Sequence, residues 1–470
     1  MERLKKSSII LKAAAIVLCI AMLAASCLLP EGGRYEITRG GWQYLAIFLM
    51  MLTLILFKVV PDWGAALISC VFLILFQITD FSGAFSGFSN STAWYTIAFY
   101  MLCTGLANSG FIKRMALHML KIFPRSYLGQ VAAFLSTVAV LCPLIPSATA
   151  KAGILSPLAC EIGEQSGYAP HSKPVIGLWS IAMVGCFYLS CAFLSGSAQC
   201  AVMMGFMGET IAWGQWALAA LPWFITGIVV LFLFCALFCA PKDRRAALPK
   251  DFFDKKIEAL GKPERKEIFG AAVLAVDVIF WLTESIHGIP ALYIIIISDV
   301  VLAAGGLLTS KEVCTKGNWT LVIFIATLLG FSGFMTKTGL NNVVSAILGP
   351  IVSPIISNPY LFIPCICILS ILLRYAIVSQ LCTMTVLNAI FLPLLPAHGI
   401  SVFVFVFASF MSGGHWNVPY ANALVMGVIS FAGEDHITYQ DARMTSYVYN
   451  IICVVGCTLS VPLWRMRGLC

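Results

Sequence analysis

Two apolar stretches of this chain carry the same polar interruption, and this match constrains its fold more than any other feature. Both read hydroxyl residue, any residue, threonine, seven residues and proline; the first begins at Ser147 and the second at Thr383, 236 positions later. A second pair of similar segments follows at 197–205 and 419–427, 222 positions apart. Matched breaks in two halves of an apolar chain are typical of secondary transporters built from repeats, whose binding site lies near the bilayer midplane.

The composition predicts an all-α polytopic membrane protein. The chain of 470 residues is 60% hydrophobic and 11% charged, and its mean hydropathy is +0.93. Apolar runs long enough to cross a bilayer recur along it, whereas a β-barrel would show alternating segments of about ten residues. The net charge of +8 does not indicate a nucleic-acid partner, because much of it lies in loops that we place in the cytoplasm.

No motif in the chain favours catalysis. The 18 cysteines lie mostly inside apolar segments and form no Cys-x-x-Cys pair, and there are only six histidines. We interpret the cysteines as small membrane-helix residues and expect no metal site. Because no His/carboxylate motif or nucleotide loop is present, a membrane-embedded enzyme or a channel is the less favoured class, and we expect no enzyme activity and no cofactor.

The apolar segments predict about 11 transmembrane helices plus two re-entrant helical hairpins. The N-terminal apolar run, which follows Lys5 and Lys6 and reaches Leu29, could imitate a secretory signal, and we favour a retained first transmembrane helix. The expected helices lie near residues 8–29, 43–60, 63–79, 93–110, 127–145, 175–194, 213–240, 268–286, 290–308, 319–336, 359–378, 400–417 and 444–464.

The positive-inside rule gives a consistent topology in a cell (inner) membrane of bacterial type, with the N-terminus and the polar linker 241–267 in the cytoplasm. In it, 127–165 enters the membrane from the cytoplasm as a hairpin, and 359–396 enters from outside. Each hairpin tip is expected to carry one repeat motif. Residues 111–123 place Lys and Arg among apolar residues, which predicts an amphipathic helix on the membrane surface, and 338–349 is its expected counterpart.

The hairpin tips predict an anion site. A broken membrane helix leaves backbone N–H groups unpaired at each half-helix start, where the helix dipole adds about half a positive charge. Hydroxyl groups of Ser147, Thr149, Thr383 and Thr385 would add donors at the same place. The alternative is that these residues bond to their own backbone or pack helices, as Ser and Thr commonly do in membranes.

Lys151 stands one helical turn after Ser147, and an ionised Lys at bilayer depth costs about 3 kcal/mol or more. Such a residue is usually functional, so we expect it beside the substrate; the alternative is that its side chain reaches cytoplasmic water. Arg374 and His415, near the second motif, are weaker candidates for contact with an anion. Three acidic residues in or near apolar segments, which we interpret as polar contacts or segment ends rather than a proton relay, are Asp277, Glu284 and Asp299.

The chain resembles the divalent anion:sodium symporter family, also called solute carrier family 13, over essentially its whole length. The segments that carry the resemblance are 88–94, 146–154, 213–222 and 282–288. It implies two inverted-topology repeats, a homodimer, and an elevator mechanism that carries di- or tricarboxylate anions. It also implies a scaffold of 1–126 and 268–357, with a moving transport domain of 127–240 and 358–470 on either side of the 241–267 linker.

The resemblance also assigns site residues, with two departures from the family pattern. Ala148 and Met384 replace the Asn of the family's two Ser-Asn-Thr motifs, and Pro143 replaces a hydroxyl residue of the first sodium site. Neither Ala148 nor Met384 offers the hard amide oxygen that a small cation prefers. The implied substrate-binding residues are Ser147, Ala148, Thr149, Lys151, Ser197, Thr383, Met384, Thr385, Asn417 and Pro419, and the implied cation-binding residues are Ser147, Gly196, Ser379 and Val418.

These departures lead to a hypothesis of sodium-independent exchange of one carboxylate for another. Lys151 occupies the position of the basic residue in the citrate/succinate and 2-oxoglutarate/malate exchangers, where a fixed cation could replace the mobile one. The alternative is a sodium- or proton-coupled symporter of the same fold, for a carboxylate or a sulfate-like anion. In either case the partners are a small organic anion, the lipid bilayer and a second copy of the chain, with no nucleic acid.

Overall fold

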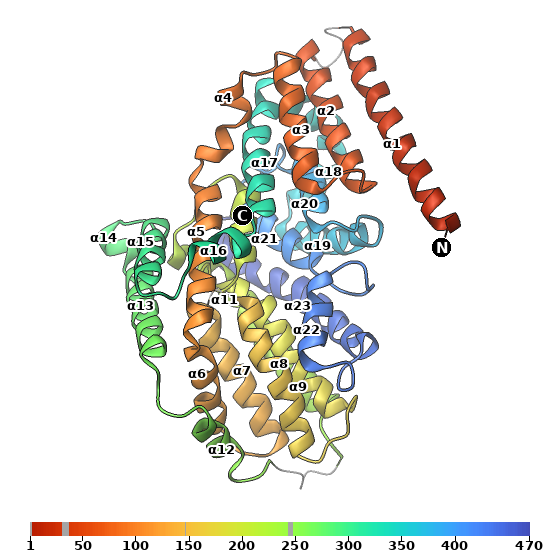
Figure 1. The fold of residues 1–470 in the computed structure, drawn as a ribbon. Helices are drawn as coiled ribbons and strands as arrows, with labels where there is room; N and C mark the ends of the chain where they lie inside the picture. The colour runs from red at the N-terminus through yellow and green to blue at the C-terminus, as the bar shows by residue number, and fades with distance from the viewer. Residues whose placement is uncertain (1, 31–36, 146, 243–247) are drawn as a thin grey trace.

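The computed structural model describes residues 2–30, 37–145, 147–242 and 248–470 (Figure 1). The first half forms α1 (Glu2–Leu28), α2 (Arg39–Leu56), α3 (Asp62–Leu75), α4 (Phe81–Ala84), η1 (Ser86–Ser89), α5 (Ser91–Ser109), α6 (Phe111–Lys121), α7 (Tyr127–Leu144), α8 (Ala148–Gln165), α9 (Lys173–Phe187), η2 (Leu189–Ala192), α10 (Ala198–Met207) and α11 (Trp213–Leu237). The second half forms α12 (Phe252–Ala259), α13 (Arg265–Leu282), α14 (Glu284–His287), α15 (Ala291–Ala304), α16 (Ser310–Lys316), α17 (Trp319–Lys337), α18 (Leu340–Ile356), α19 (Pro359–Ala376), α20 (Gln380–Phe391), η3 (Pro396–His398), α21 (Val402–Gly413), α22 (Ala423–Ala432) and α23 (Tyr439–Met466).

The helices confirm a polytopic membrane protein. Within the described residues, seven helices are long and apolar enough to cross a bilayer, or eight if the bent pair α16–α17 forms one span. Other expected spans are shorter than their apolar runs: α3 and α15 have 14 residues each. The α15 helix ends at Ala304 because Gly305 and Gly306 follow it, and Gly306 adopts a positive φ of 72° that continues no α-helix.

Both expected hairpins are pairs of helices separated by a short break. The break between α7 and α8 ends at Ser147, whose Oγ accepts a hydrogen bond from the N–H of Ala150. The break between α19 and α20 ends at Ser379, whose Oγ accepts a hydrogen bond from the N–H of Cys382. Each serine therefore caps the second arm of its hairpin. The two capping serines lie 232 positions apart, whereas the two motifs lie 236 positions apart. The second motif therefore begins at Thr383, one turn inside α20, and not at the hairpin tip as expected.

A broken helix follows each hairpin. In the first half, α9 and η2 end before 193–197, and Ser197 caps α10 by accepting from the N–H of Gln199. In the second half, α21 ends at Gly413 and Asn422 caps α22 by accepting from the N–H of Leu424. The two halves interlock around these breaks, because α8 packs on α22, α10 contacts α20 and α21, and α11 lies along α23.

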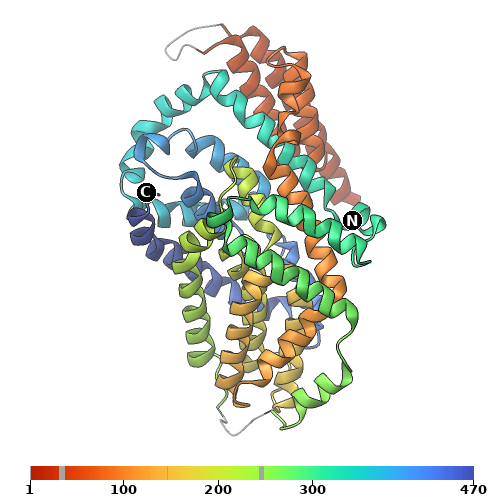
Figure 2. The same ribbon diagram turned by 90° about the vertical axis from the view of Figure 1, so that its left-hand side faces the viewer.

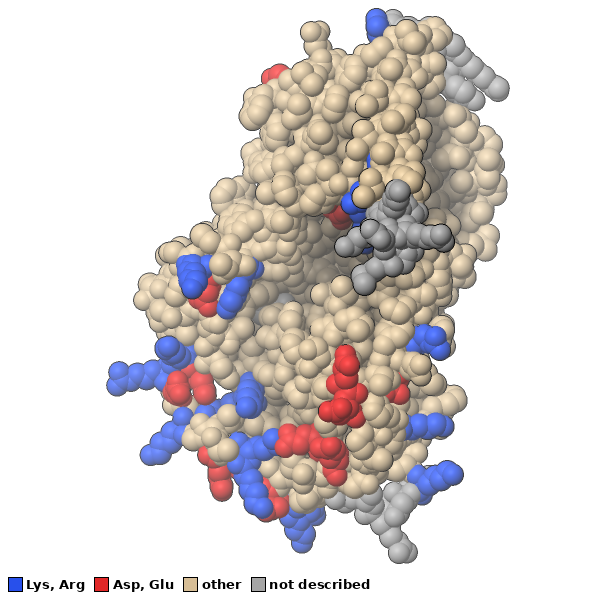
Figure 3. All heavy atoms as spheres, turned by 45° about the vertical axis from the view of Figure 1, so that its right-hand side comes forward, with Lys and Arg blue, Asp and Glu red and all other residues tan. Residues whose placement is uncertain are grey.

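Charged side chains gather at one end of the molecule. Figure 3 shows Lys, Arg, Asp and Glu over the lower half of one face and few over the upper half, and Figure 1 places α6 and α12 at that lower end. The amphipathic α6 is confirmed as a helix, with Phe111, Ala116 and Leu120 buried. Arg114 of α6 donates from Nε to Glu267 at 2.6 Å, which ties the helix to the start of α13.

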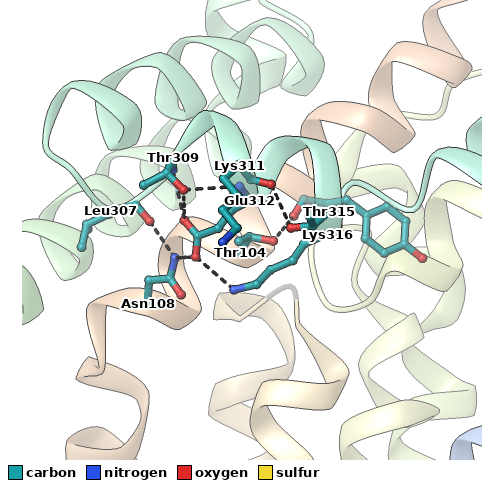
Figure 4. Close-up of polar contacts among 9 residues, drawn as sticks. Thr104, Asn108, Leu307, Thr309, Lys311, Glu312, Thr315 and Lys316 are labelled. Carbon is teal, nitrogen blue, oxygen red and sulfur yellow. Dashed lines mark hydrogen bonds and ion pairs between the residues drawn. The ribbon is translucent and has the colours of Figure 1, made fainter.

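A compact polar cluster joins α5 to α16 (Figure 4). The Glu312 carboxylate accepts from Asn108 Nδ2 of α5 at 2.8 Å and from Lys316 Nζ at 3.0 Å. It also accepts from the backbone N–H of Thr309 at 3.1 Å, completing a capping box at the start of α16. This cluster fixes the turn after α15, on the opposite side of the molecule from the C-terminus in Figure 2.

Candidate functional site

The first half holds a buried lysine at its helix break. Lys151 lies on α8 with 1% of its surface exposed. Its Nζ donates to Ser190 Oγ of η2 at 2.7 Å and to the carbonyl of Gly196 at 2.9 Å. The side chain therefore bridges the hairpin to both sides of the break between η2 and α10. The alternative expectation, that Lys151 reaches cytoplasmic water, is wrong.

The backbone at Gly196, which accepts from this lysine, is packed tightly against two other carbonyl groups. A Cβ at position 196 would lie 2.1 Å from the carbonyl oxygen of Ser190 and 2.6 Å from that of Cys142, so only glycine fits. The neighbouring Ser195 donates from Oγ to the carbonyl of Pro143 at 2.6 Å. Pro143 has no hydroxyl group to offer a sodium ion. Its carbonyl instead accepts the hydrogen bond from Ser195 and holds the break against α7.

The charge of Lys151 lacks a counter-charge within the described residues. No Asp or Glu of that part of the chain lies within ion-pair distance of its Nζ, and both of its acceptors are neutral. An ammonium group has three N–H donors, and only two have partners here. A buried cation is costly unless it is paired, so an anion supplied from outside the chain would find both a charge and a free donor at Lys151.

The hydroxyl groups of the second motif are used by their own helix. Thr383 Oγ1 donates to the Ser379 carbonyl at 3.1 Å, and Thr385 Oγ1 donates to the Leu381 carbonyl at 2.8 Å. Both contacts join residues four apart in α20, which is how Ser and Thr commonly behave inside helices. Met384 between them is buried. The geometry matches the alternative given for these threonines, since their protons are not directed at a ligand.

Ser379 connects the second hairpin to a helix far away in sequence. Its Oγ donates to Asp62 Oδ2 at the start of α3, at 3.0 Å. The expected contributors from the following break are also engaged: Asn417 Nδ2 donates to the Tyr375 hydroxyl at 2.9 Å, and its Oδ1 accepts from Asn450 at 3.1 Å. Among the remaining residues assigned to the two sites, Ser147, Ala148 and Val418 are partly buried, Ser197 is buried, and Thr149 and Pro419 are exposed.

His415 and two of the three acidic residues in or near apolar segments, Asp277 and Glu284, have internal partners. His415 Nε2 contacts the carbonyl of Ile371 at 3.0 Å, and its Nδ1 lies 3.3 Å from the N–H of Asn417. Asp277 on α13 accepts from Ser298 of α15, beside Asp299. Glu284 accepts the backbone N–H of Trp213 at 3.1 Å, which caps α11 where no neighbouring side chain does. These contacts support the interpretation of Asp277 and Glu284 as structural polar groups, whereas Oδ1 of Asp299 is buried without a hydrogen-bond partner among the described residues.

One cavity of about 360 Å³ lies between α2, α17 and α18 on one side and α10 and α20 on the other. Its lining is mostly apolar, with Tyr44, Phe206 and Phe331 among the larger side chains. Of the residues assigned to substrate binding, Thr385 lines it and Lys151 does not. The structure therefore places the two motifs in two separate hairpins, and does not bring all the expected residues into this cavity.

A family model described as the sodium:sulfate symporter transmembrane region matches residues 10–469. The chain belongs to this family. Within it, the chain is 28% identical over 347 residues to the chloroplastic dicarboxylate transporter 1 of Arabidopsis thaliana, covering 70% of this chain and 61% of that protein. It is 22% identical to the L-tartrate/succinate antiporter of Escherichia coli, over 95% of this chain and 96% of the antiporter. The chain thus spans about three fifths of its chloroplast relative.

Two solved transporters share the fold. The YdaH transporter of Alcanivorax borkumensis superposes with a TM-score of 0.58 at 14% identity, over 97% of this chain and 98% of that one. MtrF of Neisseria gonorrhoeae superposes with a TM-score of 0.55 at 12% identity, over 97% and 94% of the two chains. At these identities the likeness establishes the architecture alone.

Proposed function

We propose that this protein exchanges di- or tricarboxylate anions across the membrane without a coupling cation. The observation that carries the proposal is Lys151, a buried cation whose partners among the described residues are the neutral Ser190 and Gly196. A substrate carboxylate would pair with it. The printed names of two relatives, a dicarboxylate transporter and an L-tartrate/succinate antiporter, support the choice of a carboxylate.

The position of the Lys151 ammonium supports independence from sodium. The carbonyl that it contacts belongs to Gly196, one of the residues assigned to the first cation site. The ammonium group beside this carbonyl would repel a mobile cation that approached the same oxygen. The side chain thus supplies the positive charge that sodium would otherwise bring to this break, and it does so permanently.

The same lysine favours obligate exchange. Moving an unpaired charged side chain through the middle of a bilayer costs about 3 kcal/mol or more, and an anion bound at Lys151 removes most of that cost. The loaded site would therefore cross more readily than the empty one. We propose that it crosses by an elevator motion, in which 127–240 and 358–470 move against 1–126 and 268–357 within a homodimer.

Uptake into proteoliposomes tests the proposal. Labelled succinate or citrate is supplied outside, with or without the same acid inside, in sodium buffer and in choline buffer. We expect uptake to need internal substrate and to be equal in the two buffers, and Lys151→Ala to abolish it while the variant purifies as folded protein. Uptake into empty vesicles that needs sodium or a proton gradient would instead establish a cation-coupled symporter.

A further inference from the structure

The second half contains a buried cation of its own. Arg374 lies in the last turn of α19, just before the tip of the second hairpin, and only 2% of its surface is exposed. It is among the largest fully enclosed side chains of the described residues, together with several tryptophans. A guanidinium group keeps its charge in proteins, so this arginine adds a permanent positive charge beside the second helix break.

The guanidinium is surrounded by backbone carbonyl groups. Its Nε donates to Gly413 at 2.9 Å and its Nη1 to Ile377 at 2.8 Å, and further hydrogen bonds reach Val378 and Ala421. Ile377 and Val378 form the hairpin tip, while Gly413 ends α21 and Ala421 precedes α22. Carbonyl groups in the last turn of a helix and in the breaks between helices have no partner within a helix, so one side chain satisfies unpaired acceptors of the hairpin tip and of both sides of the break.

Lys151 and Arg374 perform the same task from different arms of their hairpins. Lys151 lies on the second arm of the first hairpin, and Arg374 on the first arm of the second. The separation of 232 that relates the two capping serines relates Arg374 to Cys142, whose Sγ contacts Ser190 Oγ at 3.3 Å. The first half therefore bonds both arms of its hairpin to its own break, the second half bonds its first arm through Arg374, and each half places a positive charge on one arm.

We propose that Arg374 is the resident cation of the second repeat. A cage of neutral carbonyl oxygens from a hairpin tip and a helix break is the kind of site that would otherwise hold a small hard cation. Arg374 fills it permanently. With Lys151 it gives the two breaks two fixed positive charges, which match the two negative charges of a dicarboxylate. This inference rests on the proposed function, because it assigns the second charge of the same anion site.

The charge at Arg374 is also uncompensated within the described residues. No carboxylate of that part of the chain lies within ion-pair distance of the guanidinium. Four of its five N–H donors are accounted for by the four carbonyls, and one remains. A purely structural role would be served as well by an uncharged side chain that donates hydrogen bonds. The charge is therefore the property that an experiment must isolate.

Chemical rescue provides the first test. Arg374→Ala is purified in detergent, and its melting temperature is measured with millimolar guanidinium, sodium, choline or urea, the last being an uncharged molecule of similar shape. We expect the variant to melt several degrees below wild type and guanidinium to restore part of the loss, because a ligand that binds only the folded state stabilises it. Wild type should not respond, and neither should Arg114→Ala, whose guanidinium pairs with Glu267 near the surface.

Two outcomes of the melting experiment would overturn the proposal. An Arg374→Ala variant that melts like wild type would mean that the carbonyl cage needs no cation. A loss that urea restores as well as guanidinium, or that no cation restores, would mean that shape and hydrogen bonding matter and charge does not. If Arg374→Ala does not fold, transport by the conservative variants Arg374→Lys and Arg374→Gln decides alone.

Transport by two conservative variants separates charge from hydrogen bonding. Arg374→Lys keeps the charge, and Arg374→Gln keeps donors without it. We expect Arg374→Lys to retain a measurable fraction of succinate exchange and Arg374→Gln to lose at least tenfold more. Equal activity of the two, or higher activity of Arg374→Gln, contradicts the assignment of Arg374. A sodium requirement of the wild-type protein would refute the proposed function instead, and the melting experiment would still judge the carbonyl cage.

Discussion

Asn388 donates a hydrogen bond from Nδ2 to the carbonyl of Phe206 at 2.9 Å, and this contact has an exact internal counterpart. In the other half, Ser156 donates from Oγ to the carbonyl of Val428 at 3.2 Å. The donors are 232 positions apart, as are the two capping serines, and the acceptors are 222 apart, as are the two segments after the hairpins. The second arm of each hairpin thus bonds to the broken helix of the opposite half. The repeat in the sequence therefore corresponds to two structural halves that bond to each other.

These paired contacts predict matched losses of stability. Asn388→Ala and Ser156→Ala should each cost about 1 kcal/mol, the typical net worth of one hydrogen bond. Because the two bonds share no partner, the double variant should lose the sum. Thermal unfolding in detergent measures this, with Ser430→Ala, an exposed serine on α22, as control. A double variant that loses no more than either single one would show that the two contacts are not independent.

The sequence predicted the hairpins and the broken helices because each leaves a local sign: a polar interruption within an apolar run. The sequence placed the tip of the second hairpin incorrectly. Thr383 and Thr385 have the same residue pattern as the first motif, but Ser379 is the residue that caps α20. Lys151 stands out in the sequence as a charge within an apolar stretch, but its acceptors, 39 and 45 residues away across a break, leave no sign in the sequence. Arg374 gave one usable signal, a lone charge in an apolar span, whereas its carbonyl partners depend on the folded backbone.

Gly196 should tolerate no side chain. In Gly196→Ala the new Cβ would meet the carbonyl oxygens of Ser190 and Cys142, so the break must shift, and we expect a cost of about 3 kcal/mol together with loss of the Lys151 contact. Gly214→Ala in α11 is the matched control, because a Cβ there meets nothing within 4 Å and alanine favours the helix. Melting temperature and succinate exchange are the measurements. A Gly196→Ala variant as stable and active as the control would refute this account of the break.

Ser190 should affect transport by positioning Lys151. Ser190→Ala removes one of the two acceptors of the ammonium, while the Gly196 carbonyl remains. A hydrogen bond to a charged group is worth about 1.5–3 kcal/mol, so we expect the concentration of succinate at half-maximal exchange to change by roughly tenfold. Ser190→Thr restores the hydroxyl and should recover part of the effect. Uptake that is unchanged in Ser190→Ala would show that Lys151 does not depend on this contact.

Glu312 should stabilise the joint between α5 and α16. Glu312→Ala removes the carboxylate that accepts from Asn108, Lys316 and Thr309, and should cost about 1–2 kcal/mol through loss of the capping box and of the link between helices. Lys311→Ala, on the exposed side of the same short helix, should cost little. Thermal unfolding compares the two variants. Because no residue of the cluster is among those assigned to the substrate or cation sites, the proposed sodium-independent exchange should not change in either variant.

The contact between Asp62 and Ser379 offers a direct test of the elevator motion. Asp62 begins α3 in the region assigned to the scaffold, and Ser379 lies at the tip of the hairpin assigned to the moving domain, yet they share a hydrogen bond of 3.0 Å. Paired cysteines at these positions should be joined by a short thiol-reactive cross-linker in vesicles, after replacement of the exposed Cys314 and Cys365 by serine. If the two regions slide past each other, cross-linking should abolish exchange and a cleavable linker should restore it on reduction. Each single cysteine variant, treated in the same way, controls for modification alone. Full exchange by the cross-linked protein would mean that Asp62 and Ser379 stay together throughout transport, and that the moving unit is not the one we assign.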